Sequence, residues 1–327
     1  MTISIGLIAF EGCIGSSVHA LADLFTTANA INRQMGRQGD LFSTPVLTPN
    51  GSSVTASNGH EIPSDGVLRA DVPAEVLMVP GIGMEAVGEI DETLAQMRPL
   101  IDTLAEQATH RKITTASCTG TFLLAEAGVL TGQQATTTWW LASEFAKRYP
   151  SIDLRSGEIL VDAGPVITSA AGTSYLDLAL HVISRLADPQ TAHLCAKFMV
   201  VDGGRTSQRP YTIPWHFMKR DPLIEKAAAW VRQEITREVS VATLATHLNM
   251  SPRTLHRRLS RDHQQTPQEF IQEIRMQEAM RLLETTKQSV AEVGIGIGYA
   301  DENTFRRAFS AHIGTTPTQH RMRFREG

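Results

Sequence analysis

The sequence is poor in cysteine and has no long apolar run. Only Cys13, Cys118 and Cys195 occur among 327 residues, widely scattered and without CxxC spacing. A disulfide framework and a structural zinc site are therefore not expected, and a reducing cytoplasm is the expected location. No apolar stretch approaches the ~20 residues of a membrane-spanning helix, and the N-terminus lacks the pattern of a signal peptide. We expect no membrane association, bound metal or cofactor.

Acidic and basic residues are unevenly distributed along the chain. Residues 1–205 hold 12 Lys and Arg against 21 Asp and Glu, a net charge of −9, whereas residues 206–327 hold 18 against 13, a net charge of +5. A basic module joined to an acidic one is typical of a protein that meets a polyanion at one end only. A basic domain that binds no polyanion would show the same charge balance, so charge alone does not identify the partner.

The first two hundred residues alternate apolar strands with helical stretches. Predicted strands lie at 3–10, 75–79, 113–117, 159–161 and 166–168, and predicted helices at 16–33, 91–108, 120–127, 139–148 and 174–186. This alternation predicts an α/β domain over residues 1–202, with a mostly parallel sheet and helices on both faces. Glycines and prolines then predict a linker over 203–221, and residues 222–327 read as an all-α domain.

A helix-turn-helix motif is predicted within Val241–Leu259. Leu244, Ala245 and Leu248 are the inward residues of its first helix, and Asn249 tolerates the left-handed backbone of a tight turn. Ser251 is a suitable N-cap for the second helix, which turns Leu255 inward together with Leu259. Four polar residues are left on the open face, where a recognition helix reads the major groove. These are Arg253, Thr254, His256 and Arg257.

The same unit recurs about fifty residues later. Val293 and Ile297 take the inward positions, Gly298 makes the turn, and Phe305 and Phe309 anchor the second helix. The long helix expected over 267–284 would hold the two motifs in fixed relation, so that they read adjacent major-groove segments about 34 Å apart. The expected outward residues are Glu302, Asn303, Thr304, Arg306 and Arg307. A protein-docking bundle with solvated arginines is the competing interpretation.

The runs SPRTLHRRLSRD, TPQEFIQEIRMQEAMRLLE and SVAEVGIGIGYADENTFRRAFSAHIGTTPTQHR resemble the AraC-type DNA-binding domain over about residues 222–325. The resemblance implies binding to double-stranded DNA, action together with RNA polymerase, and a homodimer. Gly294 replaces the alanine usual in this family. Gly294 and Gly296, within one helix, should each lower the stability of that helix by up to ~1 kcal/mol relative to alanine. The second motif is therefore predicted to be the less stable of the two.

Cys118 lies between an apolar strand and a helix, in the segment ITTASCTGTFLLAEAGVL. Small neighbours at Ala116 and Gly120 are typical of a nucleophile elbow, where a sharp turn places the side chain at a helix N-terminus. Together with MVPGIG, EGCIGSSVHALADLF and AGPVITSAAGTSYLDLALHVI, this segment resembles the PfpI-like branch of the class I glutamine amidotransferase-like superfamily. The combination with an AraC-type module resembles GlxA-type regulators. The resemblance implies a flavodoxin-like fold for the N-terminal domain.

Catalysis by Cys118 would require a base. PfpI-like proteases carry a histidine directly after the cysteine, where this chain has Thr119, and many GlxA-type regulators carry one at the position of Thr138. Glu11, His19 and His181 do not complete a hydrolytic apparatus, so we expect no catalytic residue and regard Cys118 as a vestigial nucleophile. A cysteine-dependent amidase or protease, and a redox sensor at Cys118, stay open as alternatives.

The remaining interpretation is an effector pocket above the strand ends, where open α/β sheets bind ligands. The resemblance suggests a nitrogenous metabolite such as an amino acid or a quaternary amine. The function predicted is that of a transcription regulator whose N-terminal domain binds a small effector. The expected pocket residues are Cys118, Thr119, Gly81, Ile82, Ser16, Ser17, Thr138 and Trp139.

Overall fold

The computed structural model describes residues 2–69, 74–83, 90–212, 222–237, 239–263 and 265–325. The chain divides into two compact units, and the main boundary falls between Gln208 and Arg209. This boundary lies inside the segment expected to be a linker, whose residues 213–221 are outside the described ranges.

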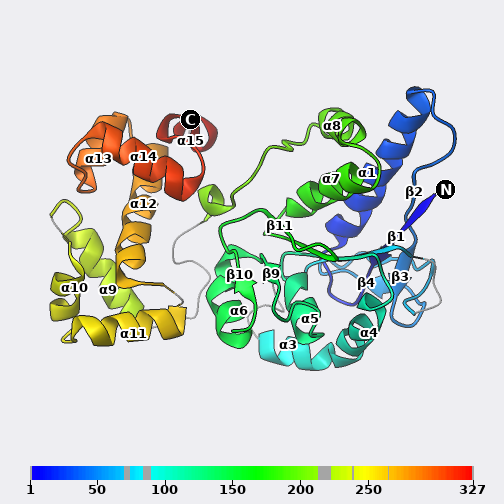
Figure 1. Cartoon of the computed structure of the whole chain (residues 1–327), viewed down its shortest axis with the longest axis horizontal. Helices are drawn as coiled ribbons and strands as arrows, with labels where there is room; N and C mark the ends of the chain where they lie inside the picture. The colour runs from blue at the N-terminus through cyan, green and yellow to red at the C-terminus, as the bar shows by residue number, and fades with distance from the viewer. Residues whose placement is uncertain are drawn as a thin grey trace. The chain divides into compact units, whose positions relative to one another are not determined.

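The N-terminal unit is built on a mostly parallel sheet (Figure 1). Its strands are β1 (Ile3–Ile8), β2 (Phe42–Ser43), β3 (Val46–Thr48), β6 (Gly66–Val67), β7 (Val76–Val79), β8 (Ile113–Ser117), β11 (Leu160–Asp162) and β12 (Val166–Ser169). The order β11-β12-β8-β7-β1-β3-β6 is parallel except for the β11–β12 pair, and β2 also pairs with β1. The central strands are buried along their length, as strands covered on both faces must be.

Helices cover both faces of this sheet. Figure 1 shows α1 (Gly15–Gln34), α7 (Ser174–Leu186) and α8 (Pro189–Phe198) on one side, with α3 (Ile90–Gln96), α4 (Arg98–Ala108) and α5 (Gly120–Glu126) on the other. The remaining elements are the hairpin β4 (Val54–Thr55) and β5 (Glu61–Ile62), the pair β9 (Gln134–Ala135) and β10 (Asp153–Leu154), η1 (Trp139–Leu141) and α6 (Ala142–Arg148). The prediction of a flavodoxin-like sheet is confirmed.

The predicted helix over 91–108 is broken at Met97, which separates α3 from α4. Pro99, in the first turn of α4, lacks the N–H that a continuous helix would need, and it favours a helix start. Similarly, the predicted helix over 139–148 begins with the 3₁₀ turn η1. The short strands β2 and β3 and the helix α8 were not expected from the sequence.

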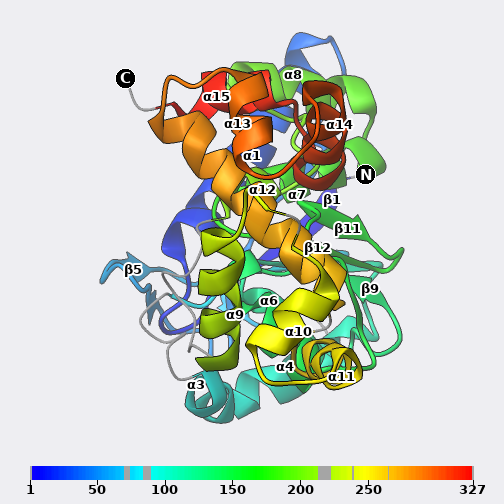
Figure 2. The same cartoon turned by 90° about the vertical axis from the view of Figure 1, so that its left-hand side faces the viewer.

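The C-terminal unit contains η2 (Arg209–Tyr211), α9 (Pro222–Gln233), α10 (Val241–His247), α11 (Pro252–His263), α12 (Pro267–Thr285), α13 (Val290–Gly296), α14 (Glu302–Ile313) and α15 (Pro317–Phe324). Figures 1 and 2 show α12 running between a group formed by α9, α10 and α11 and a group formed by α13, α14 and α15. The N-terminal half of α12 buries Phe270 and Ile274 in the first core, and its C-terminal half buries Met280 and Leu283 in the second. The predicted long helix therefore joins the two motifs.

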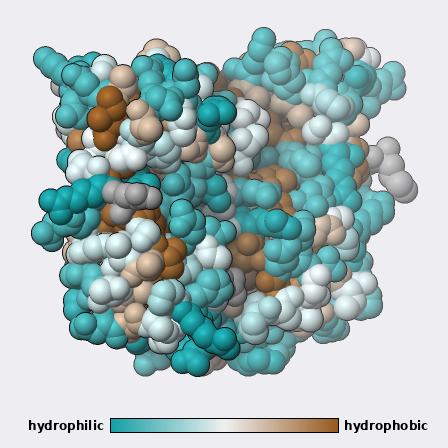
Figure 3. All heavy atoms as spheres, turned by 60° about the vertical axis from the view of Figure 1, so that its left-hand side comes forward, coloured by the Kyte–Doolittle hydropathy of each residue, from teal (hydrophilic) through white to brown (hydrophobic). Residues whose placement is uncertain are grey.

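Hydrophilic residues dominate the face of the molecule seen in Figure 3. Among the described residues, the large apolar side chains that are exposed are Phe198, Val200, Ile295 and Met322. No helix in the described part of the chain is long and apolar enough to cross a membrane.

Candidate effector pocket and DNA interface

Cys118 occupies a strained turn between β8 and α5. Its φ of +56° is in the left-handed region that a residue with a side chain rarely adopts. Its amide donates to the carbonyl oxygens of Ser169 and Ala170, at 2.9 and 3.0 Å, which fixes the turn against the end of β12. A Cβ on Gly120 would lie 2.4 Å from the carbonyl oxygen of Pro80, so α5 approaches β7 more closely than a side chain permits. The predicted nucleophile-elbow geometry is present.

The thiol of Cys118 is buried, with only 3% of the residue exposed. Burial raises the pKa of Cys118 above its ordinary value, and hydrogen bonds from the amides of Thr119 and Gly172 and the Thr119 hydroxyl do not compensate. Reactive cysteines have the opposite environment, with a lowered pKa and solvent access. The elbow therefore holds a neutral thiol near pH 7.

Thr119 is bound to the loop that follows β7. Its hydroxyl accepts a hydrogen bond of 2.6 Å from the amide of Ile82 and donates one of 3.0 Å to the Ile82 carbonyl. In an elbow-type hydrolase, free backbone amides beside the nucleophile stabilise the oxyanion. Here the Ile82 amide is already engaged by a side chain of the elbow itself.

Four of the expected pocket residues lie together at the carboxyl ends of β7 and β8. Cys118 and Thr119 face Gly81 so closely that a Cβ on this glycine would lie 3.2 Å from the Cys118 Cβ and 3.1 Å from the Thr119 hydroxyl. The Gly81 carbonyl accepts a hydrogen bond from the Ile14 amide, which brings the loop after β1 to the same place. This is the strand-order switch between β1 and β7, the usual binding position in such sheets.

The other expected pocket residues have mixed positions. Ser16 is exposed, whereas Ser17 is buried and donates its hydroxyl to the Ile14 carbonyl, 2.6 Å away. Thr138 is buried, and its hydroxyl has no partner among the described residues. Trp139 is half-buried and packs edge-on against Trp140 with 5.3 Å between ring centroids.

Sequence reasoning missed two residues that connect this region. Thr137 is buried and donates its hydroxyl to the Cys118 carbonyl at 2.9 Å. Gln208 donates from Nε2 to the Thr137 carbonyl at 2.9 Å and to the Ser156 carbonyl at 2.7 Å. The run of threonines at 136–138 is unusual for a buried loop and was a usable signal. Gln208 had none, because it lies in a segment without regular pattern.

Of the three residues considered as bases, Glu11 and His181 have other partners and His19 is exposed. The Glu11 carboxylate accepts a 3.0 Å hydrogen bond from the Thr55 amide in the β4–β5 hairpin. His181 pairs with Asp162 at 2.7 Å, within a group that includes Arg185. His19, on α1, is exposed. Within the described ranges, no group of three or more His, Cys, Asp or Glu residues is placed to hold a metal ion.

Both helix-turn-helix motifs have the expected geometry. Asn249 makes the first turn at φ +55° and Gly298 makes the second at φ +89°. The nine residues expected to face inward are all buried: Leu244, Ala245, Leu248, Leu255, Leu259, Val293, Ile297, Phe305 and Phe309. Ser251 caps α11 by accepting a 3.1 Å hydrogen bond from the Thr254 amide.

The first recognition helix, α11, has an open basic face. Arg253, His256 and Arg257 are exposed, whereas Thr254 is half-buried and its hydroxyl lies 2.9 Å from that of Ser251. A groove of about 640 Å³ follows this face. It is lined by Val241, Pro252, Arg253, His256, Arg257, Thr266, Pro267 and Gln268.

The second recognition helix, α14, leaves fewer of its expected residues free. Asn303 and Arg307 are exposed, four residues apart on one face. Arg306 is half-buried and pairs with Glu302 at 2.6 Å. The Thr304 hydroxyl donates to the capping carboxylate of Asp301 at 2.7 Å.

Residues 20–185, about half of the chain, match the DJ-1/PfpI family. The chain belongs to the DJ-1/PfpI family. This DJ-1/PfpI protein also matches a helix-turn-helix domain over residues 244–323. The predicted combination of a PfpI-like domain with an AraC-type DNA-binding domain is therefore confirmed.

Curated relatives align with this chain over most of their length. The chain is 29% identical over 287 residues to the HTH-type transcriptional regulator CdhR of Pseudomonas aeruginosa, covering 86% of this chain and 82% of the relative. It is 25% identical to the HTH-type transcriptional regulator GlxA of Rhizobium meliloti, covering 90% and 89%. A solved structure from Vibrio parahaemolyticus, described as a transcriptional regulator, gives a TM-score of 0.50 at 21% identity, covering 61% of this chain and 100% of that one. The first two relatives are named as transcriptional regulators, and the solved structure shows the fold of the N-terminal unit.

Proposed function

We propose that the DJ-1/PfpI protein is a sequence-specific transcription regulator whose N-terminal domain binds a small effector and thereby controls DNA binding. The observation that carries this proposal is the pair of helix-turn-helix motifs built on one helix, α12, with exposed arginines on both recognition helices. The match to a helix-turn-helix domain and the names of full-length relatives support it. Such a chain acts on chromosomal DNA in the cytoplasm.

The effector pocket is assigned to the carboxyl ends of β7 and β8, around Cys118, Thr119, Gly81 and Ile82. Thr138 and Trp139 are included because their neighbour Thr137 is bonded to the Cys118 carbonyl. The unpartnered hydroxyl of Thr138 is a polar group that a ligand would satisfy. Ser16 and Ser17 remain proposed lining residues at the start of α1.

The proposed effector is a nitrogenous metabolite, an amino acid or a quaternary amine. The test is thermal unfolding of the full chain against amino acids, amines and quaternary ammonium compounds, because a ligand that binds only the folded state raises the midpoint. A compound that raises the midpoint of wild type but not of Thr138→Val supports the pocket. A flat response across the panel contradicts a nitrogenous effector.

The N-terminal domain is proposed to be non-catalytic. The buried, neutral thiol of Cys118 and the engagement of the Ile82 amide by Thr119 both support this. They also argue against a peroxide sensor, which needs an accessible thiolate. Cys118→Ser separates the alternatives: loss of turnover would support an amidase or protease, and loss of a peroxide response would support a sensor. Unchanged effector-dependent DNA binding supports the proposal.

A homodimer and contact with RNA polymerase complete the proposed mechanism. The two motifs of one chain would read adjacent major-groove segments, and a dimer would repeat this reading on a second half-site. Sedimentation of the full chain with and without duplex DNA tests the dimer. A monomer at all concentrations and on DNA would contradict it.

A further inference from the structure

The two units are joined by residues 204–211, here called the strap. The halves of the strap are fixed within different units: residues up to Gln208 belong to the N-terminal unit, and residues from Arg209 belong to the DNA-binding unit. The chain therefore changes unit between two adjacent residues, each of which has its own anchor.

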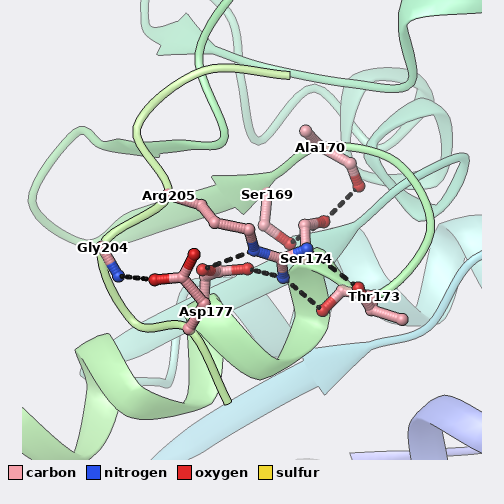
Figure 4. Close-up of polar contacts among 8 residues, drawn as sticks. Ser169, Ala170, Thr173, Ser174, Asp177, Gly204 and Arg205 are labelled. Carbon is pink, nitrogen blue, oxygen red and sulfur yellow. Dashed lines mark hydrogen bonds and ion pairs between the residues drawn. The ribbon is translucent and has the colours of Figure 1, made fainter. Parts of the chain in front are cut away.

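Arg205 is the first anchor of the strap (Figure 4). Its guanidinium donates to the hydroxyl and carbonyl of Thr173, at 3.0 and 3.2 Å, and pairs with Asp177 on α7. The Arg205 and Asp177 side chains are only 15% and 8% exposed. The same loop begins at Ala170, whose carbonyl accepts a hydrogen bond of 3.0 Å from the Cys118 amide. The hydrogen bonds and ion pair of Arg205 thus fix the strap to a loop that contacts the elbow.

Gln208 is the second anchor, on the other side of the elbow. Its side chain is fixed to the carbonyls of Thr137 and Ser156, and its amide donates to the Gly157 carbonyl at 3.0 Å. The Thr137 hydroxyl in turn donates to the Cys118 carbonyl. Two successive hydrogen bonds therefore connect Cys118 to the last residue of the N-terminal unit.

The second half of the strap is hydrogen-bonded to the C-terminal end of α14. Arg209 Nη1 donates to the carbonyl of His312 at 2.6 Å, in the last turn of this recognition helix. The His312 ring pairs with Glu273 of α12 at 2.7 Å. Tyr211 packs edge-on against Phe324, with 5.3 Å between ring centroids, and lies under the guanidinium of Arg323. A change at Arg209 therefore acts on the C-terminal end of α14.

We propose that the strap couples the Cys118 pocket to the second recognition helix, with Arg205 and Gln208 following the two loops beside Cys118 and Arg209 acting on α14. This inference rests on the proposed function, because it assigns the route by which the effector pocket controls DNA binding. It gives the two motifs different roles. The affinity of the second motif for DNA changes with the state of the Cys118 pocket, whereas the affinity of the first motif for DNA stays constant.

Hydrogen exchange of the full chain, followed by mass spectrometry, tests this route without any effector. Thr119→Val removes both hydrogen bonds between the elbow and Ile82, whereas Thr119→Ser retains the hydroxyl and is the matched control. We expect Thr119→Val to speed exchange by about two- to tenfold around the elbow, in the strap and at the end of α14, as the loss of one or two hydrogen bonds would. Exchange in α10, in the first motif, should not change.

A second substitution locates the route. In a Gln208→Glu background, which replaces the donor to Thr137 and Ser156 but leaves the Arg205 anchor, Thr119→Val should still speed exchange at the elbow but have a smaller effect at the end of α14. Thr206→Ala, at an exposed strap residue, is the matched control and should leave the transmission intact. If Thr119→Val does not fold, Thr137→Val replaces it, because it removes the bond to the Cys118 carbonyl.

Two results would overturn the inference. One is an effect of Thr119→Val confined to the elbow, with the strap and α14 unchanged. The other is an equal effect on α14 in the Gln208→Glu background, or on α10 and α14 alike, which would indicate general destabilisation. Because no effector is added, either result is independent of whether any panel compound binds.

Discussion

The two helix-turn-helix motifs have the same architecture but close their turns differently. The first turn is made by Asn249, a residue with a side chain, whose φ is +55°. The second turn is made by Gly298, whose φ is +89°. A Cβ on Gly298 would lie 2.5 Å from the carbonyl oxygen of Ile235. The second turn is therefore closed by backbone contact, whereas the first depends only on a residue that tolerates the left-handed region.

The motifs also differ in how their helices are capped. Ser240 and Ser251 cap the helices of the first motif with hydroxyl groups, paired with Thr243 and Thr254. In the second motif, the Ser289 hydroxyl also caps α13, but the group that accepts from the Ser289 amide is the Glu292 carboxylate, and a second carboxylate, that of Asp301, caps α14. The two motifs thus differ in whether carboxylates take part in their helix caps, so substitutions and pH can affect one motif without the other.

The largest difference is expected at the turns. Gly298→Ala should destabilise the DNA-binding unit by about 3 kcal/mol, because it combines left-handed strain with a clash against backbone. Asn249→Gly, the matched change in the first motif, should alter the free energy of unfolding by less than about 0.5 kcal/mol. Urea unfolding monitored by circular dichroism measures both. Equal effects would show that the two turns are equivalent.

The recognition helices should differ in which arginine matters. Arg257→Ala and Arg307→Ala should each weaken specific DNA binding by about 1–3 kcal/mol, as expected for loss of an exposed reading or clamping side chain. Arg306→Ala should cost less, because Arg306 is paired with Glu302. Fluorescence anisotropy at a fixed, near-physiological salt concentration gives the affinities. If Arg306→Ala were the most damaging of the three, the face assigned to α14 would be wrong.

The glycines of α13 should respond in opposite directions. Nothing lies within 4 Å of a Cβ at Gly296, so Gly296→Ala should stabilise the unit by up to about 1 kcal/mol through helix propensity. A Cβ at Gly294 would lie 3.0 Å from the buried Phe305 ring, so Gly294→Ala should be neutral or destabilising. Thermal midpoints of the two variants decide this. Stabilisation by both would show that Phe305 has room to move.

Acid should weaken the caps of α13 and α14, in the second motif, before those of α10 and α11, which are hydroxyl groups; the Glu269 carboxylate caps α12, the helix that joins the two motifs. Hydrogen bonds from Ser289 lower the pKa of Glu292 below its ordinary value of 4.5, and those from Thr304 lower the pKa of Asp301 below 3.8. A lowered folded-state pKa stabilises the fold above the unfolded value, and this contribution is lost as pH falls through the folded one. Methyl resonances of Ile297 should therefore change below about pH 4 before those of Leu248. Simultaneous changes would contradict the assignment of the caps.

Much of the fold was predictable because its determinants are local. The 3.6-residue periodicity of Leu255 and Leu259, the N-cap at Ser251 and the glycine at 298 are properties of short segments. The short strands β2 and β3 carry too few residues for a periodic signal, and β2 depends on pairing with β1. The break at Met97 shows the limit of periodicity, because the apolar pattern continues through it.

The candidate site was predictable only in part. Cys118 and Gly81 stand beside strand ends, so their proximity follows from the sheet. The engagement of Ile82 by Thr119 and the links through Thr137 and Gln208 join residues 37 and 71 positions apart in the sequence. Such contacts are set by tertiary packing, and no local sequence pattern predicts them.

Selection from a pool of randomised duplexes by the full chain tests the central claim most directly. The account predicts enriched sites with two elements about one helical turn apart, of which Arg257→Ala loses one and Arg307→Ala the other. A pool that stays random at near-physiological salt, or enrichment of a single element unaffected by either substitution, would contradict a regulator that reads DNA with both motifs.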